Sequence, residues 1–196
     1  RNTSNLSTME KLKLNRKYDV IYAPAAGNVG EYLWSKFGHK DTKLVILDNH
    51  APSLRWKEGL FGFMGMKVAS IADVERITKI VVKLYNSRVD DASYKPAGFI
   101  EANEEIFSED KWIETIDNLT DYSIKEFDYL QDTLEVDPTK HNLIYLTNIF
   151  SYIFNYHKYS LEQMNEKINA LLDLPNTTVI GQTPFRLNIL HENHSS

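Results

Sequence analysis

Apolar runs alternate along this chain with segments in which apolar residues recur every three or four positions. A first run covers Tyr18–Ala23, apolar positions at helical spacing follow over residues 29–37, and a second run covers Lys43–Leu47. Short apolar runs are typical of strands buried on both faces, and the three-to-four spacing is typical of a helix with one buried face. This order predicts a strand–helix–strand unit with parallel strands.

The same order returns near the C-terminus. The segment His141–Phe154 begins as a buried strand, and Asn176–Pro184 is a further apolar run. Between them, Ser160 and Gln163 have the spacing of a capping box, followed by a helix over residues 161–172 with one apolar face. Two strand–helix–strand units predict an α/β fold of three layers, with a mostly parallel sheet and right-handed crossovers.

The middle of the chain allows two assignments. We prefer Phe127–Val136 as the strand before the next apolar run, which makes residues 52–123 a helical insertion beyond the usual crossover. The alternative places the third strand at Met66–Ile71 and its helix at Val74–Tyr85. In either assignment, Ser108 caps a separate amphipathic helix.

The turn after the first run carries the candidate chemistry. Ala25, Ala26 and Gly27 leave little side-chain bulk where a ligand would approach the backbone. About 20 residues further on, Asp48 closes the second run, and a carboxylate at the end of a strand can accept hydrogen bonds from two ribose hydroxyls. The first backbone N–H groups of the intervening helix would favour a carboxylate at the same place. The segment predicts a nucleoside-cofactor pocket.

The turn sequence PAAGNVGEYL resembles a known motif. With one extra residue, it is similar to the D-P-A-A-G-N-G-x-F-L first motif of class I S-adenosylmethionine-dependent methyltransferases. The resemblance implies a Rossmann-like fold, S-adenosyl-L-methionine as cofactor, and methyl transfer to a small molecule or a protein. The acid that opens the family's motif is Ala23 here, and Glu31 is the candidate substitute. Only Gly27 and Gly30 stand where a dinucleotide fingerprint needs three glycines, so pyrophosphate binding is disfavoured.

The resemblance and the expected strand ends give a set of candidate site residues. Asp132 would lie near the adenine amino group, and residues 146–148 resemble the family's fourth motif, where substrate and methyl group meet. His50 is the nearest candidate base, although a turn histidine and a solvated acid are the competing interpretations of His50 and Asp132. The candidate cofactor-binding residues are Ala25, Gly27, Asn28, Gly30, Glu31, Asp48, Asn49, Asp132 and Thr147, and the candidate catalytic residues are His50 and Asn148.

The methyl acceptor is left open by the sequence. DNA amino-methyltransferases that share this turn carry N-P-P-Y or D-P-P-Y at the fourth motif, whereas this chain has TNIFSY, so base methylation is disfavoured. The segment SLRWKEGLFGFMG, residues 53–65, mixes cations with aromatic side chains. It could lie over the cofactor or bind an acidic substrate, or it could form a packing helix whose charges face water.

Composition limits these interpretations. With 196 residues, 42% hydrophobic and 12% aromatic, we expect one domain over residues 17–196 and a flexible segment over residues 1–16. A net charge of −5 argues against a nucleic-acid binder with a broad basic surface. The absence of cysteine excludes disulfides, thiolate metal sites and cysteine nucleophiles, and the spacing of the histidines indicates no metal site.

Location and context follow from the same sequence. No apolar run approaches the roughly 20 residues that cross a bilayer, and residues 1–17 lack a signal-peptide core, so we expect no membrane association and a cytoplasmic location. The first residue is not methionine, which suggests a piece of a larger protein, and a homo-oligomer is left open. The altered turn keeps a second function class, a catalytically silent binding or assembly module. The missing glycine triplet disfavours a nicotinamide oxidoreductase.

Overall fold

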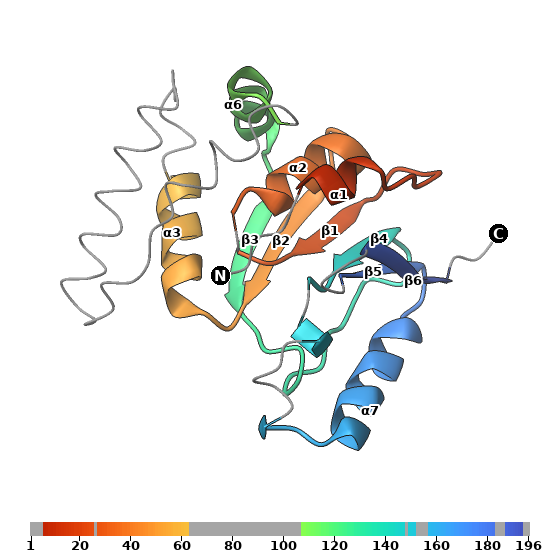
Figure 1. Ribbon diagram of the computed structural model, residues 1–196. Coiled ribbons are helices and arrows are strands. Elements are labelled where there is room, and N and C mark those ends of the chain that lie inside the picture. The colour runs from red at the N-terminus through yellow and green to blue at the C-terminus, as the bar shows by residue number, and fades with distance from the viewer. Residues whose placement is uncertain are drawn as a thin grey trace.

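The strands of the computed structural model form one sheet in the order β3-β2-β1-β4-β5-β6 (Figure 1). The described residues are 6–25, 27–62, 107–147, 149–151, 157–182 and 187–193. Five neighbouring strands run parallel: β1 (Val20–Ala23), β2 (Lys43–Asp48), β3 (Tyr122–Glu126), β4 (Asn142–Tyr145) and β5 (Thr177–Gln182). The last strand, β6 (Leu187–Asn193), pairs antiparallel with β5. The predicted α/β fold with a mostly parallel sheet is confirmed.

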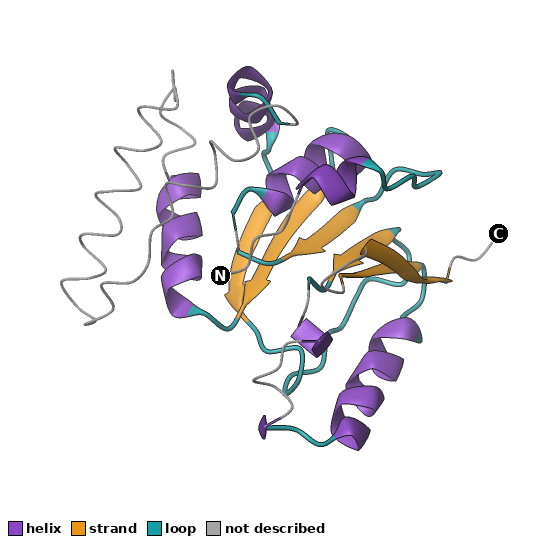
Figure 2. Ribbon diagram, viewed as in Figure 1, coloured by secondary structure: helices purple, strands orange, loops and turns teal. Residues whose placement is uncertain are grey.

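Helices cover both faces of this sheet, which gives three layers (Figure 2). One face packs against four helices, namely α1 (Leu6–Glu10), α2 (Val29–Phe37), α3 (Ala51–Gly62) and α6 (Glu109–Asn118). The other face packs against α7 (Leu161–Leu172), and a short 3-10 helix, η1 (Ile149–Ser151), adds apolar side chains to it. The central strands are therefore buried on both sides, as parallel strands usually are.

Alternation along β2 shows how the sequence fills both faces. Leu44 and Ile46 belong to the apolar cluster beneath α2 and α3. Val45 and Leu47 belong to the second cluster, on the side of α7. Because successive side chains of a strand point to opposite faces, a strand covered on both sides needs a continuous apolar run. This requirement explains why the strands could be recognised in the sequence.

The predicted helix starts are confirmed by their caps. The Ser160 hydroxyl accepts a hydrogen bond from the Gln163 amide at 3.2 Å, and the Gln163 side chain accepts one from the Ser160 amide at 2.9 Å. Ser108 caps α6 by accepting from the Lys111 amide at 3.4 Å. Each cap satisfies a backbone donor that the first helical turn leaves free.

The third strand is β3, and the prediction of a strand at Phe127–Val136 is wrong. Asp128 begins a tight turn instead. Its backbone carbonyl accepts from the amides three and four residues further on, at 2.9 and 2.7 Å, and its Oδ1 accepts from the Leu130 amide at 2.9 Å. These local bonds use the backbone groups that a strand would offer to its neighbour.

The long connection between β2 and β3 agrees in part with the predicted insertion at residues 52–123. The connection contains α3 and α6. The predicted insertion extends too far, because its last two residues, Tyr122 and Ser123, already belong to β3. The alternative strand at Met66–Ile71 and its helix at Val74–Tyr85 lie outside the described residues.

The described part of the N-terminal segment differs from the flexible segment expected over residues 1–16. Leu6 and Met9 of α1 are buried in the apolar cluster beside α2. The Lys36 ammonium donates to the backbone carbonyls of Met9 and Glu10, at 2.8 and 2.7 Å, and so satisfies acceptors at the end of α1. Residues 6–12 are therefore part of the packed fold.

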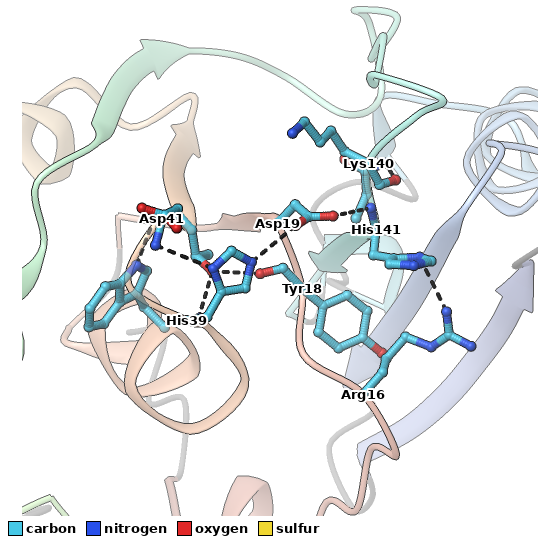
Figure 3. A network of polar contacts seen from close by, with 10 residues as sticks. Arg16, Tyr18, Asp19, His39, Asp41, Lys140 and His141 are labelled. Carbon is cyan, nitrogen blue, oxygen red and sulfur yellow. Dashed lines mark hydrogen bonds and ion pairs between the residues drawn. The ribbon is translucent and has the colours of Figure 1, made fainter.

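A polar network joins the segments that precede β1 and β4 at the amino edge of the sheet (Figure 3). Asp19 Oδ1 lies 3.0 Å from His39 Nε2, and Asp19 Oδ2 accepts from the His141 amide at 2.8 Å. Arg16 Nη1 lies 3.2 Å from His141 Nδ1. This edge is opposite to the carboxyl edge, where the candidate site residues lie.

Candidate functional site

The turn after β1 and the acid that ends β2 meet at the carboxyl edge of the sheet. The Ala25 amide donates a hydrogen bond to Asp48 Oδ2 at 3.1 Å. Gly27, in the same turn, has a φ of 57°, a backbone conformation that favours glycine. The sequence placed the small-residue turn and the carboxylate at one site, and the structure brings these two groups into direct contact.

The carboxylate of Asp48 is held by backbone amides. Besides the Ala25 amide, the His50 amide donates to Asp48 Oδ1 at 2.9 Å. Burial raises the pKa of the Asp48 carboxyl group above its ordinary value, and the hydrogen bonds from His50 and Ala25 oppose that rise. A carboxylate offers about four acceptor positions, so both oxygens can still accept hydrogen bonds from ligand hydroxyls.

Gly30 and Asn28, two of the predicted cofactor-binding residues, differ in what surrounds them. A Cβ on Gly30 would lie 2.8 Å from Ile46 Cδ1 and 3.3 Å from Ala23 Cβ. Gly30 therefore allows α2 to pack closely on the sheet, and its missing side chain faces the strands instead of a ligand. Asn28 is buried at the start of α2 but makes no side-chain capping hydrogen bond. The first amides of α2 thus lack a side-chain cap.

Glu31, the predicted substitute for the family's acid, is paired inside the protein. Its carboxylate Oε1 accepts a hydrogen bond from the Lys57 ammonium, and both side chains are fully buried. Burial lowers the pKa of Lys57, and the charge of Glu31 opposes that shift. The second carboxylate oxygen, Oε2, has no hydrogen-bond partner. The Glu31 side chain therefore connects α2 to α3, and its carboxylate is not exposed to a ligand at the turn after β1.

Lys57 belongs to the segment for which the sequence predicts either contact with the cofactor or an acidic substrate, or a packing helix whose charges face water. In the structure its ammonium lies 4.7 Å from the centre of the Trp56 ring and 5.5 Å from that of Phe61. Cation–π contacts and the Glu31 carboxylate together compensate for part of its lost hydration. The signal in the sequence was the mixture of cations and aromatics, but the partner on α2 was not evident.

Asn49 and Asp132 lie in one exposed network around the Asp128 turn. Asn49 Nδ2 donates to Asp128 Oδ2 at 3.2 Å, and Asp132 Oδ2 accepts from the Asp128 amide at 2.7 Å. Because β3 ends at Glu126, Asp132 is not the acid at the end of that strand. Its carboxylate stabilises the turn, and the turn is what brings it near Asn49.

The two predicted catalytic residues are placed differently. His50 is exposed at the start of α3, and its Nδ1 lies 2.8 Å from the Ser53 hydroxyl. Its backbone amide, as described above, binds Asp48. Asn148 lies outside the described residues. The structure therefore brings His50 next to Asp48 and makes no statement about Asn148.

Thr147 follows β4 in an unusual conformation. Its φ is 54°, although a β-branched residue rarely adopts positive φ. The side chain is 3% exposed, and its hydroxyl has no hydrogen-bond partner. Backbone strain of this kind costs about 1–3 kcal/mol and is found mainly at functional sites. Thr147 thus combines strain and an unsatisfied hydroxyl at the carboxyl edge.

Tyr129 is a further candidate site residue, which the sequence did not reveal. It lies in the Asp128 turn, its side chain is 5% exposed, and its hydroxyl has no hydrogen-bond partner. Burial, followed by the nearby charges of Tyr22 and Asp48, raises the pKa of this hydroxyl. An unsatisfied buried hydroxyl costs about 1–3 kcal/mol. Tyr129 lies in the segment Phe127–Val136 that the sequence predicts as a strand, and that prediction gives its hydroxyl no special role.

Within the described residues, no group of three or more histidine, aspartate or glutamate side chains could hold a metal ion. In the same part of the chain, none of the helices has the length and apolar character needed to cross a membrane. Comparison of the chain with protein-family models, curated proteins and solved structures gives no match.

Proposed function

We propose that the carboxyl edge of the sheet binds S-adenosylmethionine through its adenosine part, and that the chain is a methyltransferase-like domain acting on a small molecule or a protein. The observation that carries this proposal is the hydrogen bond from the Ala25 amide to Asp48. In open parallel sheets, ligands bind outside the carboxyl ends of the strands where the strand order reverses. Here the order reverses between β1 and β4, and the turn that contains Ala25 follows β1.

Thr147 supports a polar ligand at this edge. It follows β4, and its buried hydroxyl lacks a partner within the protein. Buried polar groups are almost always hydrogen-bonded, and exceptions call for a ligand, a water molecule or a functional reason. A nucleoside would supply the missing partner.

Each residue has a defined task in this proposal. S-adenosylmethionine supplies an already activated methyl group, so the chain needs to bind, orient and exclude water. Asp48 accepts hydrogen bonds from the ribose hydroxyls, and the Gly27 turn lets the ligand approach the backbone. The uncapped amides of α2 bind a carboxylate. His50 is the candidate base and Asn148 the candidate substrate contact.

A silent binding or assembly module is the second candidate function. The pairing of Glu31 with Lys57 favours it, because the carboxylate in the first turn of α2 already has a cation. The family's acid holds the amino-acid end of the cofactor, and its position is Ala23 in this chain. A domain without this contact could keep the fold and lose the activity.

Calorimetric titration separates these functions. We expect S-adenosylmethionine and S-adenosylhomocysteine to bind the wild-type chain. Asp48→Ala should weaken both by at least about tenfold, because hydrogen bonds to a charged group contribute roughly 1.5–3 kcal/mol. Asp48→Asn keeps one acceptor oxygen and should lose less. The exposed Asp41→Ala serves as the matched control and should bind as the wild type does.

Three results would contradict the proposal. Equal affinity of the wild type and Asp48→Ala would remove Asp48 from the site. Binding of NADH without binding of S-adenosylmethionine would favour an oxidoreductase. Failure of all these ligands to bind the wild-type chain would favour the silent module.

A further inference from the structure

The ring of Tyr129 is held in one place by aromatic and aliphatic neighbours. It packs edge-to-face against Phe127, with ring centres 5.0 Å apart and planes at 77°. Tyr22 and Leu146, from β1 and the end of β4, belong to the same apolar cluster. A ring fixed by packing on several sides presents its hydroxyl at a defined position, as binding sites require.

The Tyr129 hydroxyl is buried without a partner at the edge where a ligand would lie. Tyr18, at the opposite edge, shows the usual arrangement, since its buried hydroxyl donates to Thr178 Oγ1 at 2.9 Å. Within the described residues, the other unsatisfied buried atoms belong to Glu31, whose carboxylate is already paired with Lys57, to Trp112 in α6, and to Ser123 and Asn142 at the starts of β3 and β4. In that part of the chain, Tyr129 and Thr147 are the two residues with an unsatisfied buried hydroxyl in a loop that follows the carboxyl end of a strand.

Asp48 lies beside the turn that carries Tyr129, because the Phe127 amide donates to the Asp48 backbone carbonyl at 3.0 Å and Asn49 Nδ2 donates to Asp128 Oδ2 at 3.2 Å. The charge of Asp48 also contributes to the raised pKa of the Tyr129 hydroxyl. No hydrogen bond joins the two side chains, since Tyr129 Oη has no partner. One ligand hydroxyl could satisfy both. Its oxygen can accept from Tyr129, and its proton can be donated to Asp48.

Given nucleoside binding as proposed above, we propose that the Tyr129 hydroxyl donates a hydrogen bond to a ribose hydroxyl oxygen whose proton is accepted by Asp48, so that the two residues select ribose over a deoxy sugar. A tyrosine hydroxyl is protonated at neutral pH and is therefore available as a donor, and burial raises its pKa further. A site built to bond a hydroxyl rejects the analogue that lacks it, because its polar groups are then left unpaired.

Tyr129→Phe tests this role with adenosine, 2′-deoxyadenosine and 3′-deoxyadenosine as probes. We expect the wild type to bind adenosine about tenfold more tightly than at least one of the deoxy nucleosides. The variant should bind adenosine about tenfold more weakly than the wild type and should lose most of the discrimination. Without ligand, its urea midpoint should equal or exceed that of the wild type, because no internal hydrogen bond is removed.

Tyr18→Phe is the matched control. It removes a buried hydroxyl that does have a partner, so its urea midpoint should fall while adenosine affinity stays unchanged. Wild-type affinity for adenosine in Tyr129→Phe would overturn the role of Tyr129 and leave the proposed function intact. Loss of stability in Tyr129→Phe as large as that in Tyr18→Phe would reveal an internal partner and also overturn it. If the wild type binds neither adenosine nor S-adenosylmethionine, both proposals fail.

Discussion

At the scale of single residues, two glycines of one turn act for different reasons. Gly27 adopts a positive φ, which a side chain would strain. Gly30 leaves little room for a side chain, because its Cβ would lie 2.8 Å from Ile46 Cδ1 and 3.3 Å from Ala23 Cβ. The sequence motif gives both glycines the same predicted role in cofactor binding. In the structure, only Gly27 has the positive φ that suits close approach of a ligand.

Substitution of Gly30 measures this close packing. Gly30→Ala should be less stable than Gly62→Ala by about 1–3 kcal/mol, the usual cost of forcing a methyl group into a packed core. Gly62 is also helical, but a Cβ there would meet nothing within 4 Å, so the gain in helix propensity is shared by both variants. Urea unfolding gives the difference. Equal stability of the two variants would show that Ile46 moves aside without cost.

At the scale of elements, a buried ion pair fixes α3 against α2. Lys57 and Glu31 are 26 residues apart in the chain, and both are fully buried. A buried pair adds little net stability compared with apolar residues, but removal of one partner leaves a buried charge without compensation. The pair therefore makes the packing of these two helices specific.

A double-mutant cycle tests the pair. Lys57→Met should lower the free energy of unfolding by about 3–5 kcal/mol, and a second change, Glu31→Leu, should restore most of that loss. Arg55→Met in the same helix is the control, since Arg55 and Glu58 form an exposed pair that contributes at most about 1 kcal/mol. An effect of Lys57→Met no larger than that of Arg55→Met would mean that Glu31 is compensated in another way.

At the scale of the whole molecule, polar contacts connect the central strands at both their amino and their carboxyl ends. The Asp48 contacts join β1 to β2 at the carboxyl edge. At the amino edge, Asp19 connects the segment before β1 to His141, before β4, and to His39, after α2 (Figure 3). Strands that are far apart in the sequence are thereby fixed relative to one another at both the amino and the carboxyl ends.

The amino edge should make stability depend on pH. Burial alone would raise the pKa of Asp19, but hydrogen bonds from the His141 amide and His39 lower it below the ordinary value of 3.8. The carboxylate therefore stabilises the fold above that value and ceases to do so as the pH falls through its lowered pKa. Asp19→Ala should cost about 1–3 kcal/mol at neutral pH, with the difference shrinking as the pH falls below the ordinary value of 3.8 and through the lowered pKa of Asp19.

Urea unfolding at a series of pH values provides this measurement. Asp41→Ala, an exposed change in the same network, should stay within about 0.5 kcal/mol of the wild type at every pH. A stability gap between the wild type and Asp19→Ala that stays constant as the pH falls well below 3.8 would show that the pKa of Asp19 is not lowered by folding.

The sequence was informative where structure depends on near neighbours. The units β1–α2–β2 and β4–α7–β5 were predicted because buried strands need continuous apolar runs and because Ser160 and Gln163 cap α7 locally. The third strand was misplaced by a few residues, since Asp128 uses its own backbone groups in a turn and interrupts a segment of suitable hydrophobicity.

The sequence by itself determined the α/β fold, the small-residue turn and an acid at the end of β2, because hydrophobic periodicity and chain geometry limit the choices. Only the tertiary structure decided what each polar side chain meets. It joined Glu31 to Lys57, left the hydroxyls of Tyr129 and Thr147 unpaired, and placed Asp48 beside the turn. Such pairings depend on distances between segments that are remote in the chain, and local pattern carries no information about them.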